Sequence, residues 1–500
     1  MRLIELIGEN AYRAARQAGG IPPDLDGGPE ITALTADSRT VRPGALFAAL
    51  PGSAYDGRGF IGAALAAGAV AVLAPEDVRP DSVLPGATLI ADANPRRRLA
   101  LMAAAFYDAQ PETIAAVTGT NGKTSVATFL RQIWLHLGMR GASMGTLGVS
   151  AGDAALDTGP SLTTADPVAL HAKLAAMADA GIDHLAMEAS SHGLDQYRLD
   201  GVKLSAGALT NISRDHLDYH GGVEAYRTAK LRLFEDLLPE GAAAVACYEE
   251  PDQERVAAIA VRRRLNFMTY GIEAGDIRCA KAAITGTGWQ LSLAVGGRII
   301  DTEFPLPGRF QLLNALCALG LAIGCGADPE TAAAALPGLQ PVPGRMEVAA
   351  RLSNGGTAIV DFAHTPDAIR TILTALRPFV TGRLVILFGC GGDRDAGKRS
   401  VMGEIAARFA DDVIVTDDNP RSEDPAKIRS QVMTGCPGAR EIGDRAEAIR
   451  AGVALLGQGD ILVVAGKGHE TGQIVGDRTL PFNDSEMVRA AARQHEAGAV

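Results

Sequence analysis

Short apolar runs that end in polar, glycine-rich motifs recur along the chain, and helix-like segments separate them. The run at 111–118 ends in a glycine-rich turn, and an amphipathic stretch from Ser125 to Leu137 follows it. This order predicts a strand, a loop and a helix. In the last third of the chain, helix-like segments separate three more such runs, at 384–388, 413–416 and 461–464. Their alternation with helices predicts βα repetition and a parallel sheet.

The length of the chain requires more than one domain, because hydrophobic cores stop growing at roughly 250 to 300 residues. Two prolines and a glycine interrupt every periodic pattern at 340–344, which favours a linker there. We therefore expect an α/β protein of three domains, at 1–110, 111–342 and 343–500. The Ala- and Gly-rich stretch 63–74 is typical of a close-packed helix surface.

The amino-acid composition limits the kinds of molecule that the protein is expected to bind. Hydrophobic residues make up 47% of the chain and charged residues 21%, which is ordinary for globular proteins. The net charge is −11 and no run of like charge stands out, so we expect neither nucleic acid nor an acidic membrane as a partner. The six cysteines form no CxxC pair, and no apolar run suits a signal peptide or a membrane span, so a cytoplasmic protein is expected.

The most specific motif is Thr118-Gly-Thr-Asn-Gly-Lys-Thr124. Glycines let backbone N–H groups approach phosphate oxygens, the lysine can reach the terminal phosphates, and the last hydroxyl can reach Mg²⁺. Val117 stands where the standard Walker loop has its first glycine, so this is a shortened variant. The motif predicts a nucleotide site, and the alternative is a glycine turn with a solvated lysine.

Two further segments carry dense polar groups. Glu188 follows an apolar run, at a predicted strand end where a carboxylate can hold Mg²⁺; alone, it is more typical of a solvated surface residue. The segment 210–221 has more polar groups than a core could satisfy, although a capped helix start with solvated histidines explains it equally well. These groups are Asn211, Asp215, His216, Asp218 and His220.

Lys230 stands out on a predicted helix at 223–238. It falls in a stripe that should face inward, consisting of Val223, Tyr226, Lys230, Leu233, Phe234 and Leu237. Burial lowers a lysine pKa and leaves more neutral amine, which can react with CO₂ to give a Mg²⁺-binding carbamate. The alternative is a lysine whose stem is buried and whose ammonium reaches water.

Together, ordered motifs along essentially the whole chain resemble the Mur ligases: 118–124, 188–193, Asp215-His216, 228–230, 314–316, 343–345 and 361–367. Within this family the chain is most similar to the members that add diaminopimelate. The segments that carry this closer likeness are 37–39, 389–395, 418–421 and 466–470.

The resemblance implies a role for each matching residue. It implies an N-terminal UDP-substrate domain, a central P-loop ATPase-type domain with a parallel sheet, and a C-terminal Rossmann-like domain. ATP phosphates would lie on Gly119, Thr120, Asn121, Gly122, Lys123, Thr124 and Ser125, with adenine near Asn314, ribose near Asp361, and Arg345 reaching the phosphates. One Mg²⁺ would be held by Thr124 and Glu188, and the other by His216 and a carbamylated Lys230.

For the substrates, the resemblance implies two further sets. The UDP-MurNAc-dipeptide would contact Ser38, Ser53, Ala54, Tyr55, Thr163, Thr164, Ser190, Gln196 and Arg198, although Leu162 stands where some relatives carry a polar Asn. The amine, meso-diaminopimelate, would contact Arg394, Asp418, Asn419, Pro420, Arg421, Gly466 and Glu470.

The implied reaction transfers the γ-phosphoryl group of ATP to a glutamyl carboxylate, and the amine then attacks the acyl phosphate. Lys123, Glu188, His216, Lys230 and Arg345 would be the catalytic residues, in a protein expected to be a monomer. A lysine-adding Mur enzyme and a folylpolyglutamate synthetase are alternatives, and Arg421 discriminates against them because its guanidinium suits a second, distal carboxylate. A nucleotide-hydrolysing switch that joins nothing is the alternative from another class.

Overall fold

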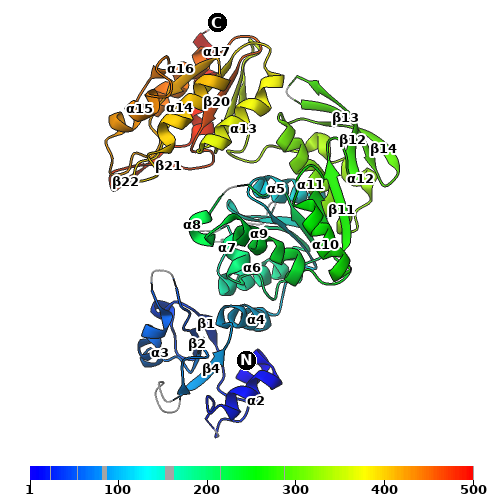
Figure 1. The fold of residues 1–500 in the computed structure, drawn as a ribbon, viewed down its shortest axis with the longest axis vertical. Helices are drawn as coiled ribbons and strands as arrows, with labels where there is room; N and C mark the ends of the chain where they lie inside the picture. Colours follow the sequence, from blue (N-terminus) through cyan, green and yellow to red (C-terminus); the bar gives the residue numbers. More distant parts are fainter. Residues whose placement is uncertain are drawn as a thin grey trace. The chain divides into compact units, whose positions relative to one another are not determined.

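The computed structural model describes residues 1–22, 24–52, 55–80, 87–151, 163–213, 215–286 and 288–498. It divides into two compact units. Unit 1 comprises Met1–Ile277 and Cys317–Ala332, and unit 2 comprises Arg278–Leu316 and Ala333–Val500. Figure 1 shows the elements of both units in sequence colours. The boundaries expected near 110 and 343 stay predictions.

The first part of unit 1 is a small α/β layer. Its four strands are parallel neighbours in the order β1-β2-β3-β4 (Ala33–Thr35, Ala45–Ala48, Ala71–Pro75, Thr88–Asp92). The helices are α1 (Leu3–Ile7), α2 (Glu9–Gln17), α3 (Ile61–Ala66) and α4 (Pro95–Tyr107). The expectation of a helix surface throughout 63–74 was wrong, because α3 ends at Ala66 and 71–75 form a buried parallel strand.

The second part of unit 1 contains a mainly parallel sheet in the order β11-β10-β9-β5-β8-β6-β7, in which β7 alone is antiparallel to its neighbour. Its strands are β5 (Thr113–Thr118), β6 (Gly141–Gly145), β7 (Gly148–Ser150), β8 (His184–Glu188), β9 (Ala206–Leu209), β10 (Ala243–Cys247) and β11 (Asn266–Gly271). The predicted order of strand, loop and helix is confirmed by β5 and α5 (Lys123–His136).

The other helices of this part are α6 (Pro167–Asp179), α7 (Ser191–Asp195), α8 (Leu217–His220), α9 (Val223–Arg232) and α10 (Gln253–Arg263). Helix α9 continues as a π-helix at Leu233–Leu237. The stripe predicted to face inward is largely confirmed, since Tyr226, Lys230, Leu233 and Phe234 are buried. The exceptions are Val223, which begins the helix and is 41% exposed, and Leu237, which is half-buried.

Unit 2 begins with three neighbouring strands, β12 (Ile277–Thr285), β13 (Gly288–Val295) and β14 (Arg298–Phe304). Helix α11 (Arg309–Gly324) runs across the division between the units, and α12 (Pro329–Ala333) follows it. The main sheet of unit 2 has the order β15-β16-β20-β17-β18-β19, with β15 antiparallel at one edge and the other pairs parallel. The predicted parallel sheet is therefore confirmed.

The strands of this main sheet are β15 (Glu347–Arg351), β16 (Thr357–Asp361), β17 (Leu384–Phe388), β18 (Asp412–Val415), β19 (Arg440–Glu441) and β20 (Ile461–Ala465). Alternate residues of β17 face opposite sides of the sheet. Ile386 belongs to the core on the side of α13 (Pro366–Leu376), α14 (Lys398–Phe409) and α15 (Pro425–Met433). Leu387 belongs to the core on the other side, with α16 (Arg445–Ala454) and α17 (Asp484–Gly498). Helices thus cover both faces of the sheet, as Figure 1 shows. A hairpin of β21 (Gly472–Val475) and β22 (Arg478–Pro481) follows β20.

Candidate active site

The loop after β5 has the backbone of an anion-binding loop. Gly119 has φ +145°, and a Cβ there would lie 1.9 Å from the Thr210 hydroxyl oxygen, so the position requires glycine. Gly122 also has a positive φ, of +89°, and the 14-residue helix α5 begins at the next residue. Unpaired N–H groups and the positive end of the helix dipole at such a start attract phosphate.

The polar segment after β9 braces this loop. Thr120 N–H donates to the Asn211 carbonyl (2.8 Å), Asn121 N–H donates to the Asn211 side-chain oxygen (3.1 Å), and the Thr210 hydroxyl donates to the Asn121 carbonyl (2.6 Å). The Tyr226 hydroxyl lies 3.0 Å from that of Thr120. Thr210 and Asn211, at the start of the predicted polar segment, therefore support the phosphate loop, a role that polar density alone did not specify.

Two lysine side chains share one carbonyl oxygen of the loop. Lys123 Nζ and Lys230 Nζ each lie 2.8 Å from the Gly119 oxygen, and Lys123 also donates to the Thr120 carbonyl. Lys230 is only 1% exposed and lies over the Tyr226 ring. Burial, and after it the charge of Lys123, lowers the pKa of Lys230 well below its ordinary value, while Asp215 acts in the opposite direction. Burial and the charge of Lys123 both favour the neutral amine over the ammonium at Lys230.

Glu188 ends β8, as predicted, and its carboxylate is held in place. Thr146 N–H donates to Oε1 (2.9 Å) and the Thr146 hydroxyl donates to Oε2 (3.2 Å). Glu188 is 2% exposed, and both of its carboxylate oxygens accept hydrogen bonds from Thr146. A buried carboxylate calls for a cation or a metal. Thr146 was not predicted as a site residue, although it follows β6, the strand beside β8, and so occupies the same kind of strand-end position.

Histidines gather near the same loop. The His192 ring centroid lies 4.9 Å from that of His216 and 5.5 Å from that of His220. His216 has a left-handed backbone (φ +50°), and its Nε2 lies 3.5 Å from Asp215 Oδ2. Among the residues that the structure describes, no three His, Cys, Asp or Glu side chains are arranged to hold a metal by themselves.

Two of the residues predicted to hold Mg²⁺, Glu188 and Thr124, carry the oxygen ligands that this ion prefers. Mg²⁺ is usually bound by one or two carboxylates together with substrate phosphates and waters, not by a cage of protein ligands. The buried Glu188 carboxylate supplies a hard oxygen, as would the hydroxyl of Thr124 in the first turn of α5. A carbamate on Lys230 would supply another beside the phosphate loop.

Five of the residues predicted to bind the UDP substrate lie together. Thr164 donates to the Glu188 carbonyl (3.1 Å) and accepts from Ser190 N–H (3.0 Å), and the hydroxyls of Thr163 and Thr146 lie 3.0 Å apart. Arg198 donates to the Thr164 carbonyl (2.7 Å) and to the Gln196 side-chain oxygen (2.7 Å). The cluster therefore adjoins Glu188.

The other predicted UDP residues are not part of this cluster. Ser38 begins a short 3-10 helix after β1, and Tyr55 is 77% exposed. Ser53, Ala54 and Leu162 lie outside the described residues.

In unit 2, the residues predicted to contact ATP form one chain of interactions. The Arg345 guanidinium lies 4.4 Å from the centre of the Phe362 ring, and the Arg345 carbonyl accepts from Gln311 Nε2 (3.1 Å). The Gln311 side-chain oxygen in turn accepts from Asn314 (3.1 Å). Burial raises the pKa of Asp361, against the opposing charge of Arg345, and its carboxylate accepts from Met346 and Ala363 N–H.

The three strand-end loops of unit 2 converge, as their positions in a parallel sheet predicted. A Cβ built on Gly466 would lie 2.6 Å from Asp418 Oδ2, and one built on Gly389 would lie 2.9 Å from Asp418 N. Asn419 links two of the loops, because its Nδ2 donates to Glu470 Oε2 (2.9 Å) and its Oδ1 accepts from Lys467 Nζ (3.0 Å). Lys467 is fully buried and also donates to Glu470 (2.8 Å).

Arg421 is held by backbone carbonyls in this structure. Its Nη1 donates to the Gly392 carbonyl (2.8 Å), and its φ is +51°. Glu423 pairs with Arg399 instead, and Asp424 caps α15, so neither carboxylate takes the guanidinium of Arg421. Arg394 is exposed and donates to the Asp393 carbonyl (3.2 Å).

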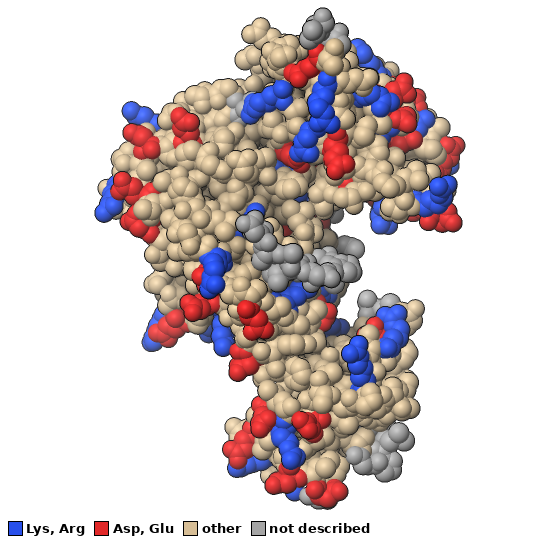
Figure 2. All heavy atoms as spheres, turned by 180° about the vertical axis from the view of Figure 1, so that it is seen from behind, with Lys and Arg blue, Asp and Glu red and all other residues tan. Residues whose placement is uncertain are grey.

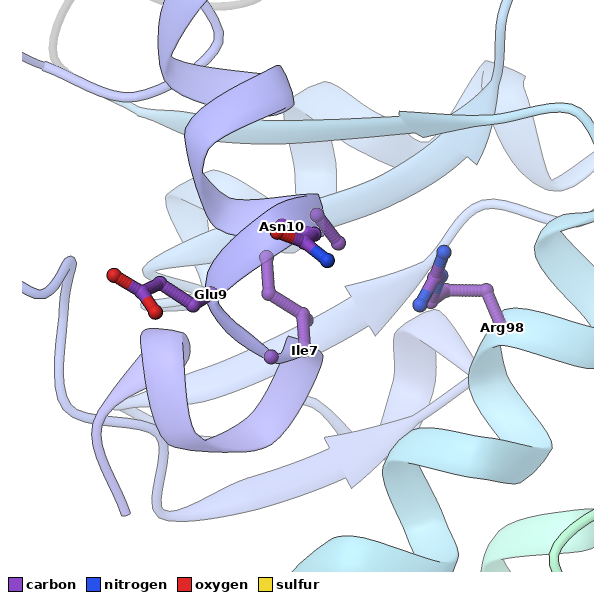
Figure 3. Close-up of a pocket in the computed structure, with 6 residues that line it drawn as sticks. Ile7, Glu9, Asn10 and Arg98 are labelled. Carbon is purple, nitrogen blue, oxygen red and sulfur yellow. The ribbon is translucent and has the colours of Figure 1, made fainter.

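A hollow in the first part of unit 1 is lined by Ile7 to Ala11 and Arg98 (Figure 3), and Arg98 is paired there with Asp92 at 2.6 Å. Acidic and basic side chains are interspersed over the face drawn in Figure 2. No helix among the described residues is long and apolar enough to cross a membrane.

Fold and site together define a nucleotide-binding α/β enzyme in which polar loops follow the strands of two parallel sheets. Three family models assign the chain to one family of such enzymes. The Mur ligase middle domain matches residues 117–322, the glutamate ligase domain of Mur ligases matches 344–468, and the catalytic domain of the Mur ligase family matches 30–107.

Individual relatives cover nearly the whole chain. The UDP-N-acetylmuramoyl-L-alanyl-D-glutamate--2,6-diaminopimelate ligase of Bradyrhizobium diazoefficiens is 52% identical, over 98% of this chain and 99% of its own. The ligase of the same name from Rhizobium meliloti is 50% identical over the same shares. A solved structure of a ligase of that name matches with a TM-score of 0.73 and 34% identity, over 96% of this chain and 98% of the other.

The folylpolyglutamate synthase of Mycobacterium tuberculosis, solved with ADP, shares the fold with a TM-score of 0.59 at 19% identity, over 74% of this chain and 91% of its own. The chain belongs to the Mur ligase family.

Proposed function

We propose that this chain is an ATP-dependent ligase that adds meso-diaminopimelate to UDP-N-acetylmuramoyl-L-alanyl-D-glutamate during the synthesis of peptidoglycan precursors. The observation that carries the proposal is the convergence of three strand-end loops around Asp418, with the Arg421 guanidinium beside them. The chain is also 52% identical to a ligase that is named for this reaction.

The first half of the reaction moves the γ-phosphoryl group of ATP to the substrate's glutamyl carboxylate and leaves ADP. Negative charge develops on the transferred group, so positive charge placed in advance stabilises the transition state. Lys123 supplies it from the phosphate loop and Arg345 from unit 2. The hydrogen-bonded cluster of Thr164, Ser190 and Arg198 beside Glu188 would orient the UDP substrate, whose carboxylate must face the phosphate.

Bound Mg²⁺ would neutralise phosphate charge during this transfer. We propose that Thr124 and Glu188 hold one ion, and that His216 and a carbamate on Lys230 hold the other. The carbamate would form when the neutral Nζ of Lys230 attacks CO₂ and releases one proton. Two observations support this role: Lys230 is buried, and its pKa is lowered by burial and by Lys123.

In the second half the neutral amine attacks the acyl phosphate: an N–C bond forms, the C–O bond to the phosphate breaks, and the proton that the nitrogen loses leaves on inorganic phosphate, as HPO₄²⁻. The protein's task is to hold the amine in line and keep water out. We assign the amine to Arg394, Asp418, Asn419, Arg421 and Glu470 of unit 2, with Pro420 and Gly466 shaping the loops. Arg421 would exchange its backbone carbonyl for the distal carboxylate of diaminopimelate.

The dependence of phosphate release on the two substrates to be joined distinguishes the proposed ligase from a nucleotide-hydrolysing switch. Phosphate release should depend on both the acceptor UDP-dipeptide and the amine. Phosphate release that proceeds equally without them would contradict the ligase and favour the switch. We also propose a cytoplasmic location, since the six cysteines are free. A monomer stays a prediction.

A further inference from the structure

A fully buried ion pair lies behind the amine-site loops of unit 2. Arg445, the first residue of α16, donates through Nε and Nη2 to the two carboxylate oxygens of Asp484, the first residue of α17, at 2.8 and 2.7 Å. Both side chains are completely inaccessible to solvent. Neither residue belongs to a motif of the predicted site.

The same guanidinium also holds the two strand ends from which the loops emerge. Arg445 Nη2 donates to the Ala465 carbonyl (2.9 Å), the last residue of β20, and Nη1 donates to the Asp417 carbonyl (3.3 Å), two residues beyond β18. The next residue in each case is a site residue, Gly466 or Asp418. Strands β18 and β20 are not neighbours, since β17 lies between them, so the sheet itself does not join these two carbonyls.

Stability alone gives little reason for a charged pair at this place. Two charges lose their hydration on burial, and an apolar pair of similar volume is often as stable or more so. What an apolar pair cannot do is hold two carbonyls at a fixed separation. The field of Arg445 also reaches the site: although burial lowers its pKa, Asp484 and then Asp418 and Glu470 raise the pKa of Arg445 above its ordinary value.

We propose that Arg445, fixed by Asp484, is a positioning residue that sets the separation of the 418–421 and 466–470 loops and so determines affinity for the amine. This inference rests on the proposed function of those loops. Arg445 acts through the backbone of two strand ends, and we assign it no contact with a substrate.

The decisive variant is the double substitution Arg445→Met with Asp484→Leu, which replaces the ion pair with apolar groups and removes both carbonyl contacts. Its melting temperature should stay near that of the parent. KM for diaminopimelate should rise by about 10-fold or more, because small misplacements of a site are costly. KM for ATP and for the UDP substrate should change by less than about 2-fold. Arg445→Lys, which keeps the positive charge but loses the planar guanidinium with its several donors, should raise KM for diaminopimelate less than the double variant does.

A matched control lies at the opposite ends of the strands. Arg383 and Asp460 precede β17 and β20 and pair at 2.8 Å. Arg383→Met should lower the melting temperature and leave KM for diaminopimelate unchanged. If the folded double variant keeps the parent KM for diaminopimelate, or if all three KM values rise together, Arg445 is not a positioning residue for the amine.

Hydrogen exchange separates this inference from the proposed function. Backbone amides of 416–421 and 465–470 should exchange at least about 10-fold faster in the double variant than in the parent, and not in Arg383→Met. Unchanged exchange would overturn the role of Arg445. If the parent forms no amide with diaminopimelate, the proposed function has failed, and the exchange result still decides whether Arg445 holds the loops.

Discussion

Arg421→Ala tests the choice of amine. Meso-diaminopimelate differs from L-lysine by a second carboxylate on the distal carbon, and a guanidinium can bind that group through two parallel charge-assisted hydrogen bonds. In the structure, Arg421 is half-buried and its Nη1 already lies 2.8 Å from the Gly392 carbonyl. Binding would therefore exchange a neutral acceptor for a charged one.

The expected loss of binding free energy in Arg421→Ala follows from this exchange of acceptors. Losing one partner of a buried charge pair costs about 2 to 5 kcal/mol, and the half-exposed position of Arg421 places the expected loss at the lower end, about 2 to 3 kcal/mol. Such a loss corresponds to a rise of roughly 30- to 150-fold in KM for diaminopimelate. KM for ATP and for the UDP substrate should stay nearly constant, because neither has contacts assigned to Arg421.

The assay is steady-state phosphate release with each substrate varied in turn, and with lysine as the competing amine. Arg450→Ala is the matched control, since Arg450 is an exposed arginine on α16 of the same unit. Arg421→Lys should fall between parent and Ala variant. An Arg421→Ala protein that prefers diaminopimelate over lysine as strongly as the parent would remove Arg421 from specificity.

Three further predictions concern the phosphate site and the linker. Lys230→Ala should lower turnover by about 100-fold or more, with partial recovery on adding a small carboxylate such as formate; parent-like turnover would exclude the carbamate. Removing divalent metal with a chelator should stop phosphate release and Mg²⁺ should restore it, whereas release that persists would contradict a metal role. Gly344→Ala should destabilise the protein by roughly 2 to 5 kcal/mol in denaturant unfolding, because Gly344 has φ +66° and its Cβ would lie 2.1 Å from His469 N. Gly438→Ala, which meets nothing within 4 Å, should be near neutral, and equal effects of the two would refute this reasoning.

The sequence predicted the strands well where apolar runs contrast with their surroundings. Leu384–Phe388 is a strand with the predicted bounds, and 461–464 differs from β20 by one residue. Residues 71–75 are alanine-rich and show no such contrast, so a buried strand resembled helix surface. The π-helix at Leu233–Leu237 was also not predicted, because it depends on packing and not on local pattern.

The site was predictable as motifs but not as contacts. Lys123, Glu188 and Lys230 stand out because a charge follows or enters an apolar pattern. Thr146, which holds Glu188 from 42 residues away, is an ordinary threonine until the strand order places β6 beside β8. Arg445 and Asp484 each begin a helix, where a solvated charge is common, so only the fold reveals that they are buried together.

The most direct test of the central claim is the mass of the product. The pure protein is incubated with ATP, Mg²⁺ and UDP-MurNAc-L-Ala-D-Glu against a panel of amino acids that includes meso-diaminopimelate, L-lysine and glutamate. We predict one new UDP-linked species, whose mass equals the acceptor plus diaminopimelate minus one water, formed together with one ADP and one phosphate. A product that contains lysine or glutamate instead, or ADP formed with no joined product, would contradict it.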